Sequence, residues 1–126
     1  HKLRKDVSNA EQLALEFALT HRLYKSHKTG KIIDEKFTVL SYPHRWHYDA
    51  LRGLDYFARV NARHDKRMKD AVELLQTKRS KDGTWPVQYK YSGKVYFDME
   101  KVGRPSRWNT LRALRILKWW NTGVEI

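Results

Sequence analysis

The chain has 126 residues, and its 26 lysines and arginines against 14 aspartates and glutamates give it a net charge of +12 at pH 7. This length corresponds to a single domain, which excludes an enzyme with separate cofactor and substrate domains. The chain has no cysteine, so disulfide scaffolds, cysteine-based zinc sites and thiol catalysis are excluded too. No apolar stretch approaches the ~18 residues that span a bilayer and no signal-peptide pattern opens the chain, so we expect a cytoplasmic protein without a membrane span.

Apolar residues at three- and four-residue spacings predict two helices in the first half of the chain. The first covers residues 8–27, with Leu13, Phe17 and Leu23 on its apolar side. The second runs from Pro43 to about residue 60. Its predicted apolar stripe consists of Trp46, Ala50, Leu54 and Phe57, widened by Leu51 and Ala58.

Two more helices are predicted in the second half. One covers residues 65–79, with Asp65 as its N-cap, and the segment 82–84 stops it in a turn that places Trp85 between helices. Residues 85–97 alternate apolar and polar side chains, which is consistent either with a short hairpin or with an irregular loop rich in aromatic residues. The last helix runs from Ser106 to about residue 121.

An internal repeat organises these elements. Residues 37–54 contain Phe-x5-Pro-His-Arg-Trp-x4-Leu-Arg-Gly-Leu, and residues 97–114 contain Phe-x7-Pro-Ser-Arg-Trp-x2-Leu-Arg-Ala-Leu. Each period holds one helix that begins near a proline and one other helix, as in proteins built from stacked helix pairs. We therefore expect a single all-α domain over residues 1–126, made of two αα-hairpin units at about 1–60 and 61–126. Because such arrays need about three or more units, we expect either the C-terminal part of a longer protein or a homo-oligomer.

Two segments resemble the αα-toroids, the repeat family of the squalene cyclases and prenyltransferases. One is Gln76 followed by Asp-Gly-Thr-Trp at 82–85, and the other is Pro-Ser-Arg-Trp-Asn-Thr-Leu-Arg-Ala-Leu-Arg from Pro105. The resemblance implies an αα-toroid-like fold. It carries over no catalytic residue, because the Asp-x-Asp-Asp motif of terpenoid cyclases and the cysteine ligand of the prenyltransferase zinc site are both absent.

The faces of the second and last helices contain the candidate binding residues. On the last helix, one half of the helical wheel is predicted to face the core: Thr110, Ala113, Leu114, Ile116, Leu117 and Trp120. The other half interleaves cations with indoles, and this pattern suits the binding of an anionic or aromatic ligand. The alternative is a solvated basic face whose Trp rings pack on a neighbouring helix. We take as candidate ligand-binding residues Arg45, Arg52, Arg107, Trp108, Arg112 and Arg115.

A second cluster could transfer protons. His47, Tyr48 and Asp49 are consecutive near the start of the second helix, and a carboxylate can orient a histidine that titrates near neutral pH. We name these three as candidate catalytic residues, against the alternative of ordinary surface or helix-end side chains. His44 and His47 have a spacing that a metal could use, but no third ligand is placed, and we expect no metal and no cofactor.

Three functions remain open from these patterns. The leading one is an αα-toroid-like segment that forms part of a cavity for a hydrophobic or anionic small ligand. The second is a basic αα-repeat module for nucleic acid or an acidic partner, suggested by charge spread over both halves of the chain but by no recognition motif. The third is an enzyme of the lyase or terpenoid cyclase type that uses His47, Tyr48 and Asp49.

Overall fold

The computed structural model describes residues 2–42, 47–89 and 101–122. Within these ranges the chain is mostly helical, with four α-helices, two short 3₁₀ helices and one two-stranded sheet, so the predicted mainly helical class is confirmed. In chain order the elements are α1 (Lys2–Thr20), η1 (Glu35–Thr38), α2 (Ala50–Arg59), η2 (Lys66–Met68), α3 (Lys69–Thr77), β1 (Trp85–Pro86), β2 (Pro105–Ser106) and α4 (Arg107–Thr122).

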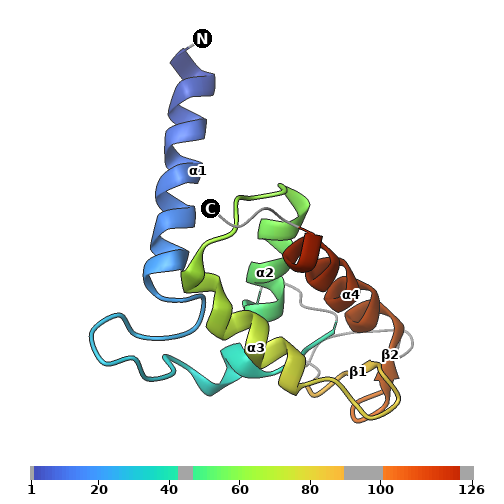
Figure 1. Cartoon of the computed structure of the whole chain (residues 1–126). Coiled ribbons are helices and arrows are strands. Elements are labelled where there is room, and N and C mark those ends of the chain that lie inside the picture. Colours follow the sequence, from blue (N-terminus) through green and yellow to red (C-terminus); the bar gives the residue numbers. More distant parts are fainter. Residues whose placement is uncertain (1, 43–46, 90–100, 123–126) are drawn as a thin grey trace, which may run out of the picture.

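Helix α1 stands apart from the body formed by α2, α3 and α4 (Figure 1). The predicted first helix at 8–27 is wrong at both ends. The helix begins at residue 2, and it ends at Thr20 because Arg22 and Leu23 have positive φ angles of 47° and 70°. Leu13 and Phe17, which the pattern placed on the apolar side, are exposed, and α1 contributes to the core mainly through Leu19.

Helix α2 begins later than predicted. Residues 47–49 have no regular structure, and Asp49 is the N-cap, whose carboxylate accepts a hydrogen bond from the backbone N–H of Arg52 at 2.8 Å. The predicted residues 43–46 lie outside the described ranges. The described members of the apolar stripe behave as expected, since four of them are buried: Ala50, Leu51, Leu54 and Phe57.

The turn after α3 is confirmed. Asp82 accepts a hydrogen bond from the N–H of Thr84 at 3.0 Å, and Gly83 has a φ of +87° that favours glycine. The indole of Trp85 is fully buried and donates to the carbonyl of Leu75 at 2.8 Å. The turn therefore places Trp85 in the core between α3 and α4.

A two-residue antiparallel pairing joins the start of the alternating segment 85–97 to the residues before α4, and the choice between a hairpin and a loop for that segment stays open. Strands β1 and β2 pair with Trp85 opposite Ser106 and Pro86 opposite Pro105. Most of the predicted alternating segment, residues 90–97, lies outside the described ranges. The pairing matters for the site because it fixes where α4 begins.

Helices α2 and α4 pack against each other, and both rise from the lower to the upper part of Figure 1, inclined to one another. Asp55 contacts Arg112 and the carbonyl of Ala62 accepts a hydrogen bond from Trp119, and both contacts join residues 57 apart in sequence. The chain just after α2 therefore lies near the end of α4, so the two helices run in the same general direction. This pair carries the candidate site.

The buried face of α4 differs from the predicted one. Arg112 and Trp119, which the helical wheel placed on the polar half, are buried, whereas Leu114 is exposed. The reason is tertiary: α2 supplies a carboxylate for Arg112, and the connection after α2 supplies a carbonyl for the indole of Trp119. The buried residues of α4 are Asn109, Arg112, Ala113, Ile116 and Trp119.

Candidate functional site: an arginine-lined pocket between α2 and α4

A pocket of about 600 Å³ lies along the α2 and α4 pair, and arginines dominate its lining. Because α2 and α4 pack against each other, side chains one turn apart on each helix converge on it. The lining residues are Tyr42, Arg52, Asp55, Tyr56, Arg59, Trp108, Leu111, Arg112 and Arg115.

Asp55 is the central carboxylate of this pocket. Its side chain is buried, and three guanidinium groups approach it: Nε of Arg59 at 3.1 Å, Nε of Arg112 at 3.4 Å and Nη1 of Arg115 at 3.8 Å. One negative charge therefore faces three positive charges at close range. The excess of positive charge remains in the pocket after Asp55 has been counted.

Arg112 is the arginine of this cluster that burial desolvates most. Only 8% of the residue is exposed, and burial lowers the pKa of its guanidinium while the nearby Asp55 partly offsets that shift. Its Nη1 atom is buried and has no hydrogen-bond partner, and neither has the Oδ1 atom of Asp55. An unsatisfied donor on a buried cation costs free energy. The more exposed guanidinium groups of Arg59 and Arg115 are the donors that an incoming acceptor can reach.

Arg52 and an aromatic pair complete the lining. The Nη1 of Arg52 donates to the carbonyl of His47 at 2.8 Å, which fixes this exposed side chain on the α2 side. The rings of Tyr42 and Trp108 are stacked, with centroids 5.9 Å apart and an interplanar angle of 12°. Flat apolar surface and guanidinium groups thus line the same pocket.

The structure brings together four of the six candidate ligand-binding residues, namely Arg52, Trp108, Arg112 and Arg115. Arg107 is exposed at the first turn of α4 and is not among the residues that line the pocket. Arg45 lies outside the described residues.

Sequence reasoning did not name five of the lining residues as ligand-binding: Tyr42, Asp55, Tyr56, Arg59 and Leu111. Tyr42 precedes α2 in sequence, and no spacing relates it to the stripe on α4. Arg59 lies four residues after Asp55, a spacing at which helical ion pairs form, and that pair is present at 3.1 Å. The sequence therefore contained the ion pair within α2, but only the packing of α4 against α2 brings further arginines to Asp55.

The three candidate catalytic residues have structural contacts here. The hydroxyl of Tyr48 donates to the carbonyl of Leu23 at 2.7 Å, and burial raises the pKa of this phenol above its usual value. Asp49 caps α2 and also accepts a hydrogen bond from the hydroxyl of Ser41 at 3.1 Å. The carbonyl of His47 holds Arg52. A catalytic role for these residues stays a prediction.

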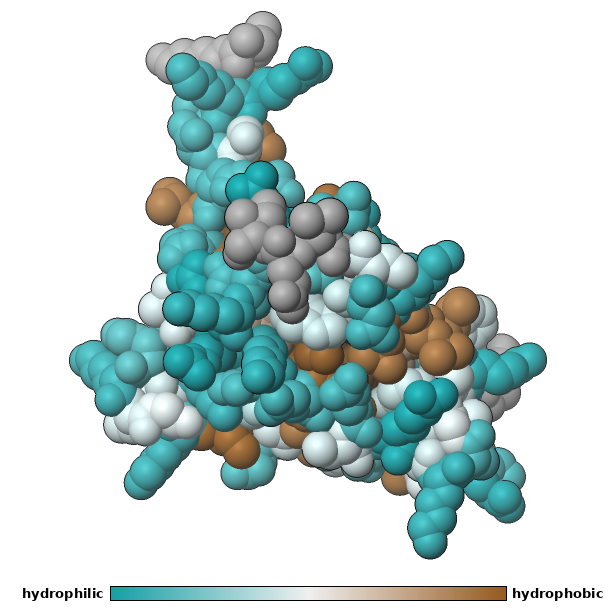
Figure 2. Space-filling view, viewed as in Figure 1, coloured by the Kyte–Doolittle hydropathy of each residue, from teal (hydrophilic) through white to brown (hydrophobic). Residues whose placement is uncertain are grey.

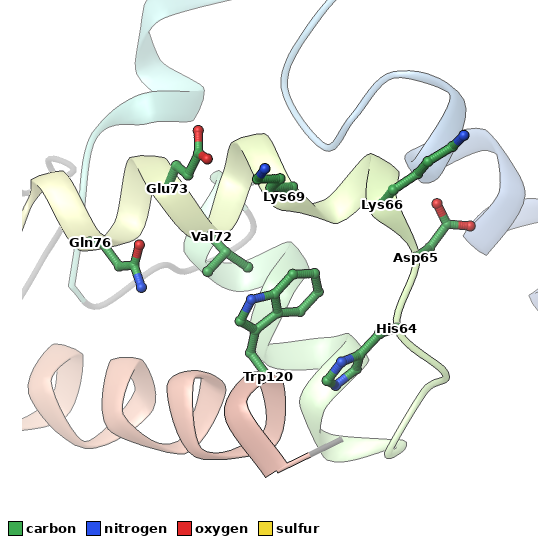
Figure 3. A pocket seen from close by; sticks show the side chains of 8 residues that line it. All are labelled: His64, Asp65, Lys66, Lys69, Val72, Glu73, Gln76 and Trp120. Carbon is green, nitrogen blue, oxygen red and sulfur yellow. The ribbon is translucent and has the colours of Figure 1, made fainter. Parts of the chain in front are cut away.

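A second pocket, of about 690 Å³, lies between α3 and the end of α4, where His64 and Trp120 meet (Figure 3). Their rings are stacked with centroids 4.7 Å apart, and the Nε2 of His64 lies 2.9 Å from the carbonyl oxygen of Trp119. Figure 3 shows Val72 on the opposite side of the Trp120 ring from His64. These contacts join the end of α4 to the connection between α2 and α3.

In the part of the chain that the structure describes, no three histidines, cysteines or carboxylates gather as metal ligands, and no helix is both long and apolar enough to cross a membrane. Comparison with models of protein families, with curated proteins and with solved structures gave no match. The functional argument therefore depends on the geometry of the chain itself.

Proposed function

We propose that this chain is a segment of an αα-repeat protein, resembling the αα-toroids, and that the pocket between α2 and α4 binds a small ligand with an anionic group and a flat apolar part. The packing of α2 against α4 supports the repeat, because these are the two helices that contain the recurring Leu-Arg-x-Leu motif. The ligand would lie against the shared face of two successive units.

The observation that carries the proposal is the excess of positive charge in the pocket, whose lining includes four arginines and one carboxylate: Arg52, Arg59, Arg112, Arg115 and Asp55. Phosphate and carboxylate oxygens match guanidinium donors, and such charge-assisted hydrogen bonds are stronger than neutral ones. The stacked rings of Tyr42 and Trp108 supply the flat apolar surface beside the cations. Asp55 holds the arginines in place while leaving the net charge positive.

Calorimetric titration with phenyl phosphate, inorganic phosphate and phenol at constant ionic strength tests the proposal. We expect phenyl phosphate to bind more tightly than inorganic phosphate, and phenol to bind more weakly than either. The double substitution Arg59→Gln and Arg115→Gln removes two cations of the pocket and should weaken phenyl phosphate binding at least about tenfold. Both side chains are more than a third exposed, so the fold should persist.

The matched control is Arg63→Gln with Lys81→Gln, which removes the same charge from exposed positions outside the pocket. Equal losses in the two double variants would overturn the proposal, because they would indicate general attraction to polyanions. A single-stranded polynucleotide that binds with a steep salt dependence, equally in both variants, would then favour the nucleic-acid function.

A further inference from the structure

The pocket between α3 and the end of α4 differs in charge from the arginine-lined pocket. Lys66 and Lys69 contribute two positive charges to its lining, and Asp65 and Glu73 contribute two negative ones. The lysines and carboxylates of this pocket therefore balance, whereas arginines outnumber the carboxylate in the other pocket. Its volume of about 690 Å³ lies within the ordinary range of small-molecule sites.

Polar side chains of α3 form one wall of this pocket. Lys69, Glu73 and Gln76 follow one another at spacings of four and three residues, which places them on one side of the helix. All three are exposed, and none makes a side-chain hydrogen bond or an ion pair in the part of the chain that the structure describes. Asp65, by contrast, is already paired with Arg67 at 2.9 Å. An ammonium, a carboxylate and an amide are thus available to a ligand.

Trp120 of α4 contributes a hydrogen-bond donor to the opposite wall. The indoles of Trp85 and Trp119 each donate to a backbone carbonyl, at 2.8 and 3.0 Å. The indole N–H of Trp120 is half-buried with its residue and has no acceptor among the described residues. Because the N–H of a buried indole usually has an acceptor, a ligand that supplies one would be favoured at this wall.

The floor of the pocket is apolar. Val72 is only 2% exposed, and Figure 3 shows Lys69 and Glu73 on one side of it and Trp120 on the other. Figure 2 shows hydrophobic side chains at the surface only in places, among many hydrophilic ones. The pocket therefore combines an apolar floor with a cation, an anion and an indole N–H around it.

We propose that this pocket binds the zwitterion of an α-amino acid with an apolar side chain. The ligand's carboxylate accepts hydrogen bonds from the ammonium of Lys69 and the indole N–H of Trp120, and its ammonium donates to the carboxylate of Glu73. The apolar side chain of the ligand covers Val72. Because the charges of the lining balance, the pocket favours a ligand without net charge over an anion. The two pockets share no lining residue, so this proposal is independent of the proposed function.

Titration of the isotope-labelled chain with L-leucine tests the proposal, with the indole N–H signal of Trp120 as the NMR readout. The substitution Trp120→Phe identifies that signal. Isocaproate lacks the ammonium of leucine, and isoamylamine lacks its carboxylate. We expect leucine to bind at least about tenfold more tightly than either analogue, because each analogue loses a charge-assisted hydrogen bond.

Two substitutions at exposed positions test the assigned roles separately. Glu73→Gln removes the partner of the ligand's ammonium and should abolish the preference for leucine over isocaproate. Lys69→Gln removes a partner of the carboxylate and should reduce the preference for leucine over isoamylamine. Matched controls are Glu35→Gln and Lys36→Gln, which neutralise exposed charges outside the pocket and should keep both preferences.

Far-UV circular dichroism establishes that each variant is folded. A Trp120 signal that does not move up to the solubility limit of leucine overturns the proposal. Equal affinities for leucine and its two analogues overturn it as well, because the pocket would then not recognise both charges. A folded Glu73→Gln protein that keeps the wild-type preference for leucine over isocaproate would have the same consequence.

Discussion

At position 53, neighbouring side chains leave no room for a residue larger than glycine. In the two Leu-Arg-x-Leu motifs the third position is Gly53 in the first unit and Ala113 in the second, and both are helical. A Cβ on Gly53 would lie 2.6 Å from the Tyr48 hydroxyl oxygen and 3.2 Å from Cδ2 of Leu23. The glycine thus leaves room for the buried hydroxyl that donates to the carbonyl of Leu23.

We predict that Gly53→Ala destabilises the protein by about 1 to 3 kcal/mol, because overcrowding outweighs the gain of about 1 kcal/mol in helix propensity. The same substitution should cost less in a Tyr48→Phe background, where the crowding oxygen is gone. Urea unfolding of the four proteins in this cycle measures the coupling. Additive effects would show that the hydroxyl is not what excludes alanine.

Buried and capping aspartates stabilise the elements of this fold, within one element or between two. Asp49 caps α2, Asp65 caps η2 through the N–H of Arg67, and Asp55 joins α2 to α4. The Asp55 and Arg112 pair is the most deeply buried of the ion pairs between described residues, with 4% and 8% of the two residues exposed. Burying two charges costs desolvation free energy, and removing one of them leaves the other buried without a counter-charge. The stability that each residue contributes therefore depends on the presence of the other.

We predict that Asp55→Ala lowers the free energy of unfolding by about 3 to 5 kcal/mol, because it leaves Arg112 buried without its carboxylate. The double variant Asp55→Ala with Arg112→Met should recover much of that loss, since no uncompensated buried charge remains. Chemical denaturation of these two variants and of the single variant Arg112→Met provides the measurement. A double variant that is as unstable as the sum of the two single variants would contradict mutual dependence.

At the scale of the whole molecule, ion pairs and a small apolar contact attach α1 and its following turn to the body. Asp70 of α3 accepts from Arg22 at 3.2 Å and from Lys25 at 3.0 Å, and Glu16 pairs with Arg67 at 2.7 Å. Lys25 and Arg22 hold the pKa of Asp70 below its usual value, and Arg67 does the same for Glu16. A carboxyl group with a lowered folded-state pKa stabilises the fold above its unfolded pKa, and that stability is lost as the pH falls through the folded value.

We predict that Asp70→Asn is less stable than the wild type at pH 7 by about 1 kcal/mol, the scale of a partly exposed ion pair. The difference should shrink as the pH falls below 3.8, the unfolded value for aspartate, because wild-type Asp70 then becomes protonated too. Urea midpoints of both proteins between pH 7 and pH 2 measure this. A difference that is constant over the whole range would show that the charge of Asp70 does not stabilise the fold.

The sequence by itself determined the helical class, the apolar stripe of α2, the caps and turn at Asp65 and Asp82, and the recurrence of Leu-Arg-x-Leu. These features depend on side-chain periodicity and on local hydrogen bonds within a few residues, which a linear sequence contains. It also drew attention to Arg52, Trp108, Arg112 and Arg115.

The tertiary structure decided where α1 ends, which face of α4 is buried, and that Asp55 is the carboxylate around which the arginines gather. A helical wheel assigns Arg112 to solvent and Leu114 to the core because it counts polarity alone. The guanidinium of Arg112 can be buried because another helix brings the carboxylate of Asp55 to 3.4 Å from its Nε atom, which compensates the lost hydration of the charge. Leu114 remains exposed because no described element of the same chain covers that side of α4.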